Sequence, residues 1–142
     1  MQTWNIYLAT VITCLFGTNA NAAAFDGSES LICSLGQVIE CDYGSDCVGT
    51  TNESVDAPDF IKLNFDKNEI VANYAGEDGT PDDINVVDLD NHLIVQGVQG
   101  TSATTGDALG WSMSINQTTG RMVLTASGVN TGFVIFGACT HL

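Results

Sequence analysis

Histidine and carboxylate side chains could carry acid–base chemistry in this chain, and they meet in the sequence around His92. Asp88 and Asp90 come just before this histidine, so a His–Asp pair activating a serine hydroxyl is conceivable. No spacing rule places a serine beside the pair, and the second histidine, His141, is penultimate. A lone histidine at a turn is more often solvated than catalytic. The sequence therefore predicts no catalytic residue.

A second group of carboxylates lies between Gly76 and Asp83, in the segment GEDGTPDD. Carboxylate oxygens are the ligands that Ca²⁺ prefers, but the segment lacks the alternating spacing that aims them at one point. We expect a solvated loop and keep calcium as the less favoured alternative. The chain also contains no G-x-S-x-G, H-E-x-x-H, phosphate-loop or dinucleotide-binding glycine motif, so no metal or cofactor site is predicted.

The amino-terminal residues have the layout of a secretory signal peptide. An apolar stretch from Ile6 to Phe16 is followed by Gly17 and by an A-x-A cleavage site at Ala20-Asn21-Ala22. The stretch is too short to span a bilayer, which needs about 20 apolar residues. A lipid anchor on Cys14 is the rival interpretation. We expect a signal peptide at 1–22, a single domain at 23–142, no membrane insertion after cleavage, and a secreted or periplasmic location.

Four cysteines remain after such cleavage. An even number in an exported chain indicates two disulfides, and zinc is disfavoured because no C-x2-C spacing occurs. Three pairings are possible. The short loop between Cys41 and Cys47 closes easily, which would leave Cys33 to pair with Cys139.

The charge of the chain restricts its partners. Seventeen acidic residues against three basic ones give a formal net charge of −14. Such a surface repels phosphates, so nucleic acid is excluded as a partner. The acids are scattered between apolar segments, which argues against a disordered acidic tail. Solubility of an exported protein explains the charge most simply, and cation binding is the alternative.

Alternating apolar residues and frequent turn residues predict an all-β fold. We expect eight strands, at Leu31–Cys41, Phe60–Phe65, Glu69–Tyr74, Ile84–Leu89, His92–Val98, Leu109–Ile115, Arg121–Ala126 and Gly132–Thr140. In the first of these, the inward face is expected to hold Leu31, Cys33, Leu35 and Ile39. Consecutive antiparallel strands favour an up-and-down barrel or a strongly curled sheet, with a two-sheet sandwich as the alternative. A Cys33–Cys139 bridge favours the barrel, where the first and last strands are neighbours.

Trp111, Met113 and Met122 are the candidate residues for an apolar ligand site. Trp111, Met113 and Ile115 share one strand face, and Met122 and Leu124 have matching spacing on the next strand. Aromatic and thioether side chains suit apolar ligands. A small barrel can also be filled by its own side chains, so a packed core is the favoured interpretation of this face. Asn52 and Asn116 lie in glycosylation sequons, which matter only in a host that glycosylates.

Several short motifs are spread along the chain after the predicted signal peptide, and each occurs once. They are Glu40-Cys41, Cys47, Pro58-x-Phe60, Leu93-x-x-Gln96-Gly97, Gly110-Trp111-Ser112 and Phe136-Gly137-Ala138-Cys139-Thr140. With these motifs the chain resembles small secreted bacterial proteins of unknown function. The resemblance implies export and a location in the bacterial envelope, and it implies no activity.

Three hypotheses for the function follow from the sequence. The favoured one is an exported, non-enzymatic β-barrel-like domain that binds a small apolar ligand or an envelope or other protein partner. The second is a small hydrolase or isomerase with a site assembled from scattered Asp, Ser and His residues. The third is a structural or adhesive subunit, which a long unpaired apolar edge strand would favour.

The signal-peptide interpretation is tested by amino-terminal sequencing of protein recovered from an exporting host. We expect the mature chain to begin at Ala23, because Ala20-Asn21-Ala22 follows directly on the apolar stretch. Recovery of an intact Met1, or of a lipid-modified Cys14, would contradict this cleavage.

Overall fold

The computed structural model describes residues 25–100 and 108–142, so the predicted signal peptide at 1–22 lies outside the described residues. The regular secondary structure of the described residues is strand, apart from one short 3-10 helix, η1 (Glu53–Val55). In the same ranges no helix has the length and apolar character needed to cross a membrane. The strands are β1 (Leu31–Asp42), β2 (Val48–Thr50), β3 (Phe60–Asn64), β4 (Glu69–Tyr74), β5 (Glu77–Asp78), β6 (Asp82–Asp83), β7 (Asn85–Leu89), β8 (His92–Gln99), β9 (Leu109–Asn116), β10 (Arg121–Ser127) and β11 (Thr131–His141).

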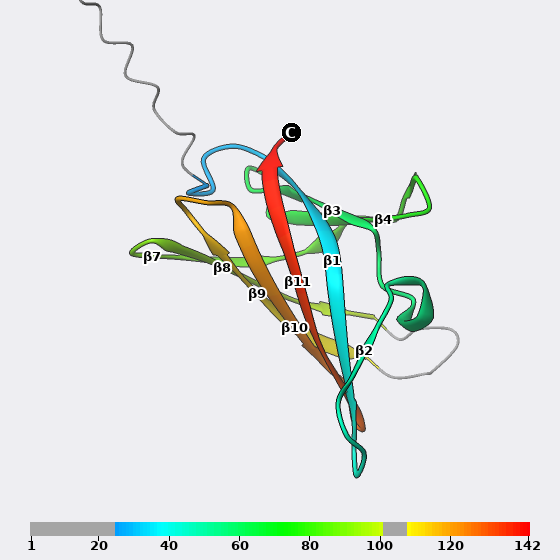
Figure 1. The fold of residues 1–142 in the computed structure, drawn as a ribbon. Coiled ribbons are helices and arrows are strands. Elements are labelled where there is room, and N and C mark those ends of the chain that lie inside the picture. Colours follow the sequence, from blue (N-terminus) through cyan, green and yellow to red (C-terminus); the bar gives the residue numbers. More distant parts are fainter. Residues whose placement is uncertain (1–24, 101–107) are drawn as a thin grey trace, which may run out of the picture.

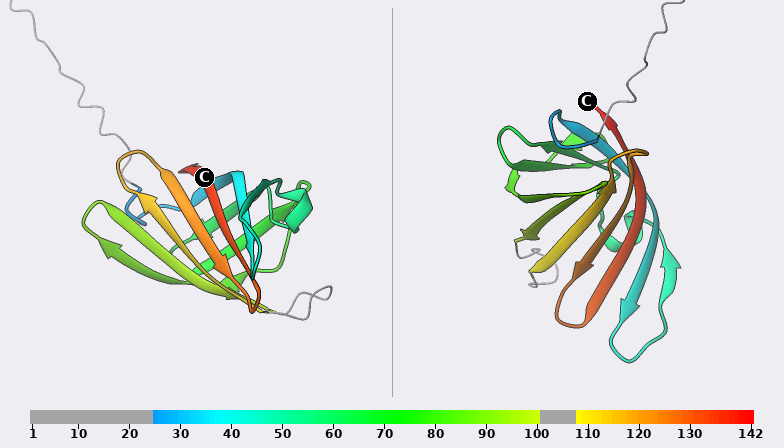
Figure 2. Two further views of the ribbon diagram at one scale, coloured as in Figure 1. Left: turned by 60° about the horizontal axis from the view of Figure 1, so that its bottom comes forward. Right: turned by 90° about the vertical axis from the view of Figure 1, so that its left-hand side faces the viewer.

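These strands form one antiparallel sheet in the order β5-β4-β3-β1-β11-β10-β9-β8-β7, with β2 on β1 and β6 on β4. The sheet curls strongly into a half-barrel (Figures 1 and 2). This confirms the predicted fold class in its curled-sheet form. The eight predicted strands correspond to β1, β3, β4 and β7 to β11, whereas the short strands β2, β5 and β6 were not predicted.

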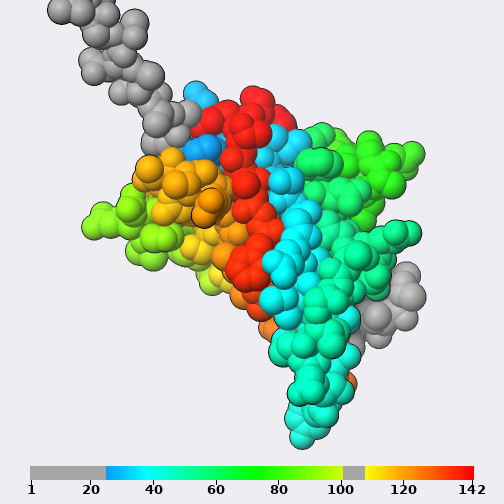
Figure 3. Space-filling model, in the orientation of Figure 1, coloured from blue at the N-terminus to red at the C-terminus, as the bar shows by residue number. Residues whose placement is uncertain are grey.

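The first and last strands meet in the middle of the sheet. β1 and β11 pair along most of their lengths, and Cys33 lies directly opposite Cys139 in that register. A disulfide joins these two residues, and a second disulfide joins Cys41 to Cys47. Both are the pairs that the sequence favoured. Two disulfides fit a protein of an oxidising compartment. Figure 3 shows β1 and β11 side by side on the outer face of the sheet.

A β-bulge in β1 corrects one predicted face. Between Leu35 and Val38 the register advances three residues on β1 but only two on β11. Such an extra residue reverses the alternation of the strand. Val38 is therefore fully buried, whereas Ile39, predicted to face inward, is only half-buried. Beyond the bulge, Glu40 also lies on the inner side of the curled sheet.

One end of the half-barrel is packed solid. Leu31, Leu63, Leu93, Met113 and Ile115 are almost completely buried there, and Met122 is 3% exposed. The segment before β1 covers this end. Its Phe25 donates a backbone hydrogen bond to Gln117 and stacks on His141, with the ring centroids 5.0 Å apart.

The two edges of the sheet, β4 and β7, are not paired with each other, but the chain crosses directly between them. β6 pairs with β4, and β7 pairs with β8, so Ile84 alone links the two sides. The backbone N–H of Ile84 donates to the Asn68 carbonyl at 2.9 Å, and its side chain is buried in the core. The covalent chain thus holds the two edges close together at Ile84.

The two disulfides should stabilise the fold unequally. Cys33 and Cys139 are separated by 106 residues, whereas Cys41 and Cys47 are separated by six. In the chain-entropy model the long loop contributes about 4–5 kcal/mol to the free energy of unfolding and the short loop about 2 kcal/mol. We expect urea unfolding of Cys33→Ala/Cys139→Ala to show the larger loss, with Cys41→Ala/Cys47→Ala as the matched control. Equal losses would contradict the argument from loop length.

Candidate functional site

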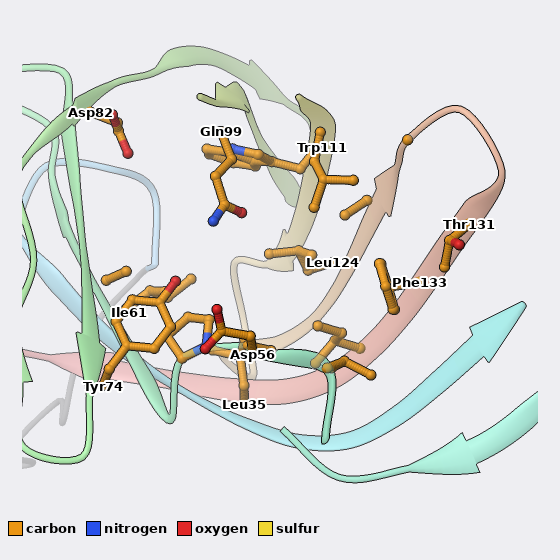
Figure 4. A pocket seen from close by; sticks show the side chains of 18 of the residues that line it. Leu35, Asp56, Ile61, Tyr74, Asp82, Gln99, Trp111, Leu124, Thr131 and Phe133 are labelled. Carbon is orange, nitrogen blue, oxygen red and sulfur yellow. The ribbon is translucent and has the colours of Figure 1, made fainter. Parts of the chain in front are cut away.

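The other end of the half-barrel encloses a cavity of about 960 Å³ that is open to solvent. Figure 4 shows side chains from several strands converging on it. Its walls are largely apolar, and the main contributors are Leu35, Ile61, Ile70, Trp111, Leu124, Phe133 and Ile135. The inner face of the sheet is therefore a packed core at one end and a cavity at the other.

Small residues at inward-facing positions explain why this end is hollow. Side chains two residues apart share a face of a strand. On β10 the inward series runs from Met122 and Leu124 to Ala126, and on β8 it runs from Leu93 and Val95 to Gly97. On β4, Ala72 likewise follows Ile70. Large side chains fill the first end, and none is present at these positions to fill the second.

Trp111 occupies part of the space that the small residues leave. It lies opposite Gly97 in the β8–β9 register, and its indole ring covers that glycine so closely that a Cβ at Gly97 would collide with the ring. The side chain is half-buried and lines the cavity, whereas Met113 and Ile115 on the same face are completely buried. Of the predicted ligand-or-core face, Met113 and Met122 thus belong to the packed core, and Trp111 belongs to the cavity.

Polar side chains line the cavity from β4, β6, β8 and the segment after η1. Tyr74, Asp56, Asp82 and Gln99 all line the cavity, and Figure 4 shows the Tyr74 hydroxyl and the Asp56 carboxylate in the same region. Burial raises the pKa of Tyr74 above its usual value, and the negative charge of Asp56 raises it further, while a hydrogen bond with Gln99 acts in the opposite direction. Tyr74 is therefore an uncharged hydroxyl at neutral pH.

Asn52 fixes the segment that carries Asp56. Its side-chain amide donates to the carbonyl of Leu35 at 2.9 Å, at the bulge in β1, and to that of Pro58 at 3.3 Å. Its backbone carbonyl accepts hydrogen bonds from Val55 and Ala57. The amide nitrogen that a glycan would occupy in this sequon is therefore already used inside the fold. The second sequon residue, Asn116, lies at the β9–β10 turn, where its side-chain oxygen accepts hydrogen bonds from Thr118 and Thr119.

The structure does not assemble the residues considered for acid–base catalysis. His92 is exposed at the start of β8, on the outer face. The Asp88 carboxylate accepts a hydrogen bond from Gln117 at 2.6 Å. Of the hydrogen bonds within the described residues, none joins His92 to Asp88 or to Ser114. His141 lies at the packed end, 3.1 Å from the Glu29 carboxylate, far from the cavity in the fold.

The acidic segment between Gly76 and Asp83 forms β5 and β6 instead of a single loop. The Asp78 carboxylate binds the Lys62 ammonium group at 2.6 Å and the Asn73 amide at 2.8 Å, which lowers its pKa. Asp82 faces the cavity instead. Within 25–100 and 108–142, no group of three or more His, Cys, Asp or Glu residues is arranged to hold a metal ion.

Several residues of the cavity escaped the sequence analysis, namely Tyr74, Asp56, Asp82 and Gln99. The sequence did contain an indication of the cavity itself. Ala72, Gly97 and Ala126 are small residues at strand positions where the alternation predicts a large inward-facing side chain. The place of Asp56 in the cavity could not be predicted from the sequence, because it depends on long-range hydrogen bonds from Asn52.

Comparisons with protein-family models, with curated proteins and with solved structures find no match to this chain. The site must therefore be interpreted from its own geometry.

Gly97 and Trp111 provide a test of how the cavity wall is built. A methyl group at Gly97 collides with the indole ring, so Gly97→Ala should displace Trp111 and lower the free energy of unfolding by about 1–3 kcal/mol. Gly110→Ala on the adjacent strand is the matched control, because a Cβ there meets nothing within 4 Å. Urea unfolding and the tryptophan emission maximum measure both effects. If the two variants behaved alike, Trp111 would not lie against Gly97.

Proposed function

We propose that this protein binds a small, largely apolar ligand in the open end of the half-barrel and is not an enzyme. The cavity of about 960 Å³ carries the proposal. Pockets for small organic ligands typically measure about 300–1,000 Å³, and they combine apolar walls with a few polar groups. The walls around Trp111 and Leu124 and the polar group around Tyr74 have this composition.

Rigid elements support the cavity, which favours binding over an incidental hollow. Most of its apolar residues lie on strands of one continuous sheet, and the 51–59 segment is held to β1 by Asn52. A site whose walls are already in place loses little conformational entropy when a ligand enters.

Catalysis is the weaker hypothesis, because neither histidine of the described residues lines the cavity, whose ionisable side chains are those of Glu40, Asp56, Asp82 and Tyr74. The exposed His92 is on the outer face, and the carboxyl groups of Asp26 and Asp78 have lowered pKa values, so both are ionised at neutral pH. Neither carboxylate lines the cavity.

Assembly through a sheet edge is also less well supported. The edge strand β7 exposes Val87 and Leu89, but it contains only five residues and includes Asp88. The opposite edge carries Glu77 and Asp78, and charged side chains on an edge disfavour pairing with another chain.

We further propose that the protein acts outside the cytoplasm, in a secreted or periplasmic form. The disulfides Cys33–Cys139 and Cys41–Cys47 support this location, since such bonds persist in oxidising compartments. The predicted signal peptide supports it independently.

Filling the cavity should abolish ligand binding. The neutral fluorophore N-phenyl-naphthylamine is the probe, because its emission rises on transfer from water to an apolar site. We expect Ala126→Phe to weaken binding at least about tenfold, since the new ring takes the space that Ala126 leaves beside Leu124. Thr125→Phe is the matched control, because its side chain lies on the exposed face of the same strand.

Circular dichroism and the unfolding midpoint establish that both variants fold. Equal binding by Ala126→Phe and Thr125→Phe would place the probe elsewhere on the protein and reject the proposed function, as would a lack of binding by the unaltered protein.

A further inference from the structure

We infer that the cavity selects amphiphiles whose polar end is positively charged, such as long-chain amines, and discriminates against anionic ones such as fatty acids. This inference rests on the proposed function, because it specifies the class of ligand for the same cavity. It is carried by the arrangement of charged and apolar side chains around the cavity.

The cavity is chemically divided. Leu124, Phe133 and Ile135, from β10 and β11, form an apolar wall, while Tyr74, Asp56 and Asp82 provide polar groups from the other side of the half-barrel (Figure 4). A third carboxylate, that of Glu40, lies at the margin of the apolar wall, opposite Phe133 in the β1–β11 register. A ligand with an apolar chain and one polar end fits this division: the chain lies against β10 and β11, and the polar end lies near Tyr74.

The charged side chains lining the cavity are all negative. They are Glu40, Asp56 and Asp82, and neither a lysine nor an arginine of the described residues is among the lining side chains. The three basic residues of the sequence are committed elsewhere: the Lys62 ammonium group binds Asp78 at 2.6 Å, Lys67 lies at the exposed β3–β4 turn, and Arg121 is exposed on the outer face. A carboxylate or phosphate entering the cavity would therefore meet only like charges.

The backbone position of Asp56 is fixed by the turn that follows η1. Asp56 follows η1 with a φ of 53°, in the left-handed region. The hydrogen bonds from Val55 and Ala57 to the Asn52 carbonyl close the turn around it. Less conformational entropy is lost on binding when the backbone that carries a charged side chain is already in place.

Tyr74 complements the carboxylates. Its hydroxyl is protonated at neutral pH, and burial raises its pKa further, so the group can accept a hydrogen bond from an ammonium group without adding charge. The overall charge of −14 acts in the same sense, since it concentrates cations and depletes anions near the cavity mouth.

The inference is tested with three ligands that share one chain and differ only in the head group: dodecylamine, dodecanol and dodecanoate. Each competes with N-phenyl-naphthylamine at neutral pH and low ionic strength, below its critical micelle concentration. For the unaltered protein we expect dodecylamine to bind roughly tenfold more tightly than dodecanoate, which matches the attraction of a carboxylate a few ångströms from an ammonium group in a partly solvated site. High salt should reduce the preference.

The variant Asp56→Asn/Asp82→Asn removes two of the three carboxylates that line the cavity. Asparagine tolerates the left-handed backbone at position 56, so the turn is retained. The amine preference should fall several-fold, because only Glu40 then carries a negative charge in the cavity. The control Asp83→Asn/Asp90→Asn removes the same amount of charge from exposed positions outside the cavity and should keep the preference. Dodecanol should bind all three proteins equally, which verifies that the cavity is intact.

A preference for dodecanoate, or an amine preference that is undiminished in Asp56→Asn/Asp82→Asn, would overturn the inference while leaving the proposed function standing. Loss of the preference in both double variants would also overturn it, because the selectivity would then come from net charge alone. Failure of the unaltered protein to bind either dodecanol or the fluorophore would instead reject the proposed function.

Discussion

Pairing of the first strand with the last is the constraint on which the rest of this structure depends. β1 and β11 are far apart in sequence, yet they form the centre of the sheet, and every other strand is added outward from them. Bringing two such distant segments together has a large entropic cost, which local contacts cannot offset early in folding. The Cys33–Cys139 disulfide makes the pairing permanent, because it restricts the unfolded chain at the point where closure is most costly.

The position of the sheet's open edges follows from this pairing. An up-and-down series whose ends are joined must leave its gap elsewhere, and here the gap lies between β4 and β7. Ile84 crosses the gap, and its buried side chain ties the two edges to the core. The packed end contains the Cys33–Cys139 disulfide and the crossing at Ile84, whereas the end with the cavity contains the Cys41–Cys47 disulfide and the Asn52 anchor. The packed core and the cavity thus lie at opposite ends of one sheet.

Strand alternation made much of the fold predictable from the sequence, including the eight long strands, their antiparallel order and both disulfide pairs. The prediction for Ile39 was wrong because a bulge is set by long-range pairing: β1 must match both β11 and β3, and local alternation carries no record of the extra residue. The cavity was missed for a related reason. Trp111 was recognised as inward-facing, but the space beside it depends on Ala72, Gly97 and Ala126, three small residues from three different strands. Their coincidence at one end appears only when the strand register is known.

The same register explains how a chain with so few basic residues can have a selective interior. Glu40 reaches the inner side because the bulge reverses the face of β1, and Asp56 reaches it because Asn52 ties its turn to the Leu35 carbonyl. The course of β1 around the bulge therefore contributes to the positions of two of the three carboxylates around the cavity. Carboxylates scattered along the sequence would ordinarily be dispersed in solvent. Here the fold places three carboxylates around an apolar cavity, where they produce a local negative potential. This potential is the physical basis for distinguishing ligands by the charge of their head group.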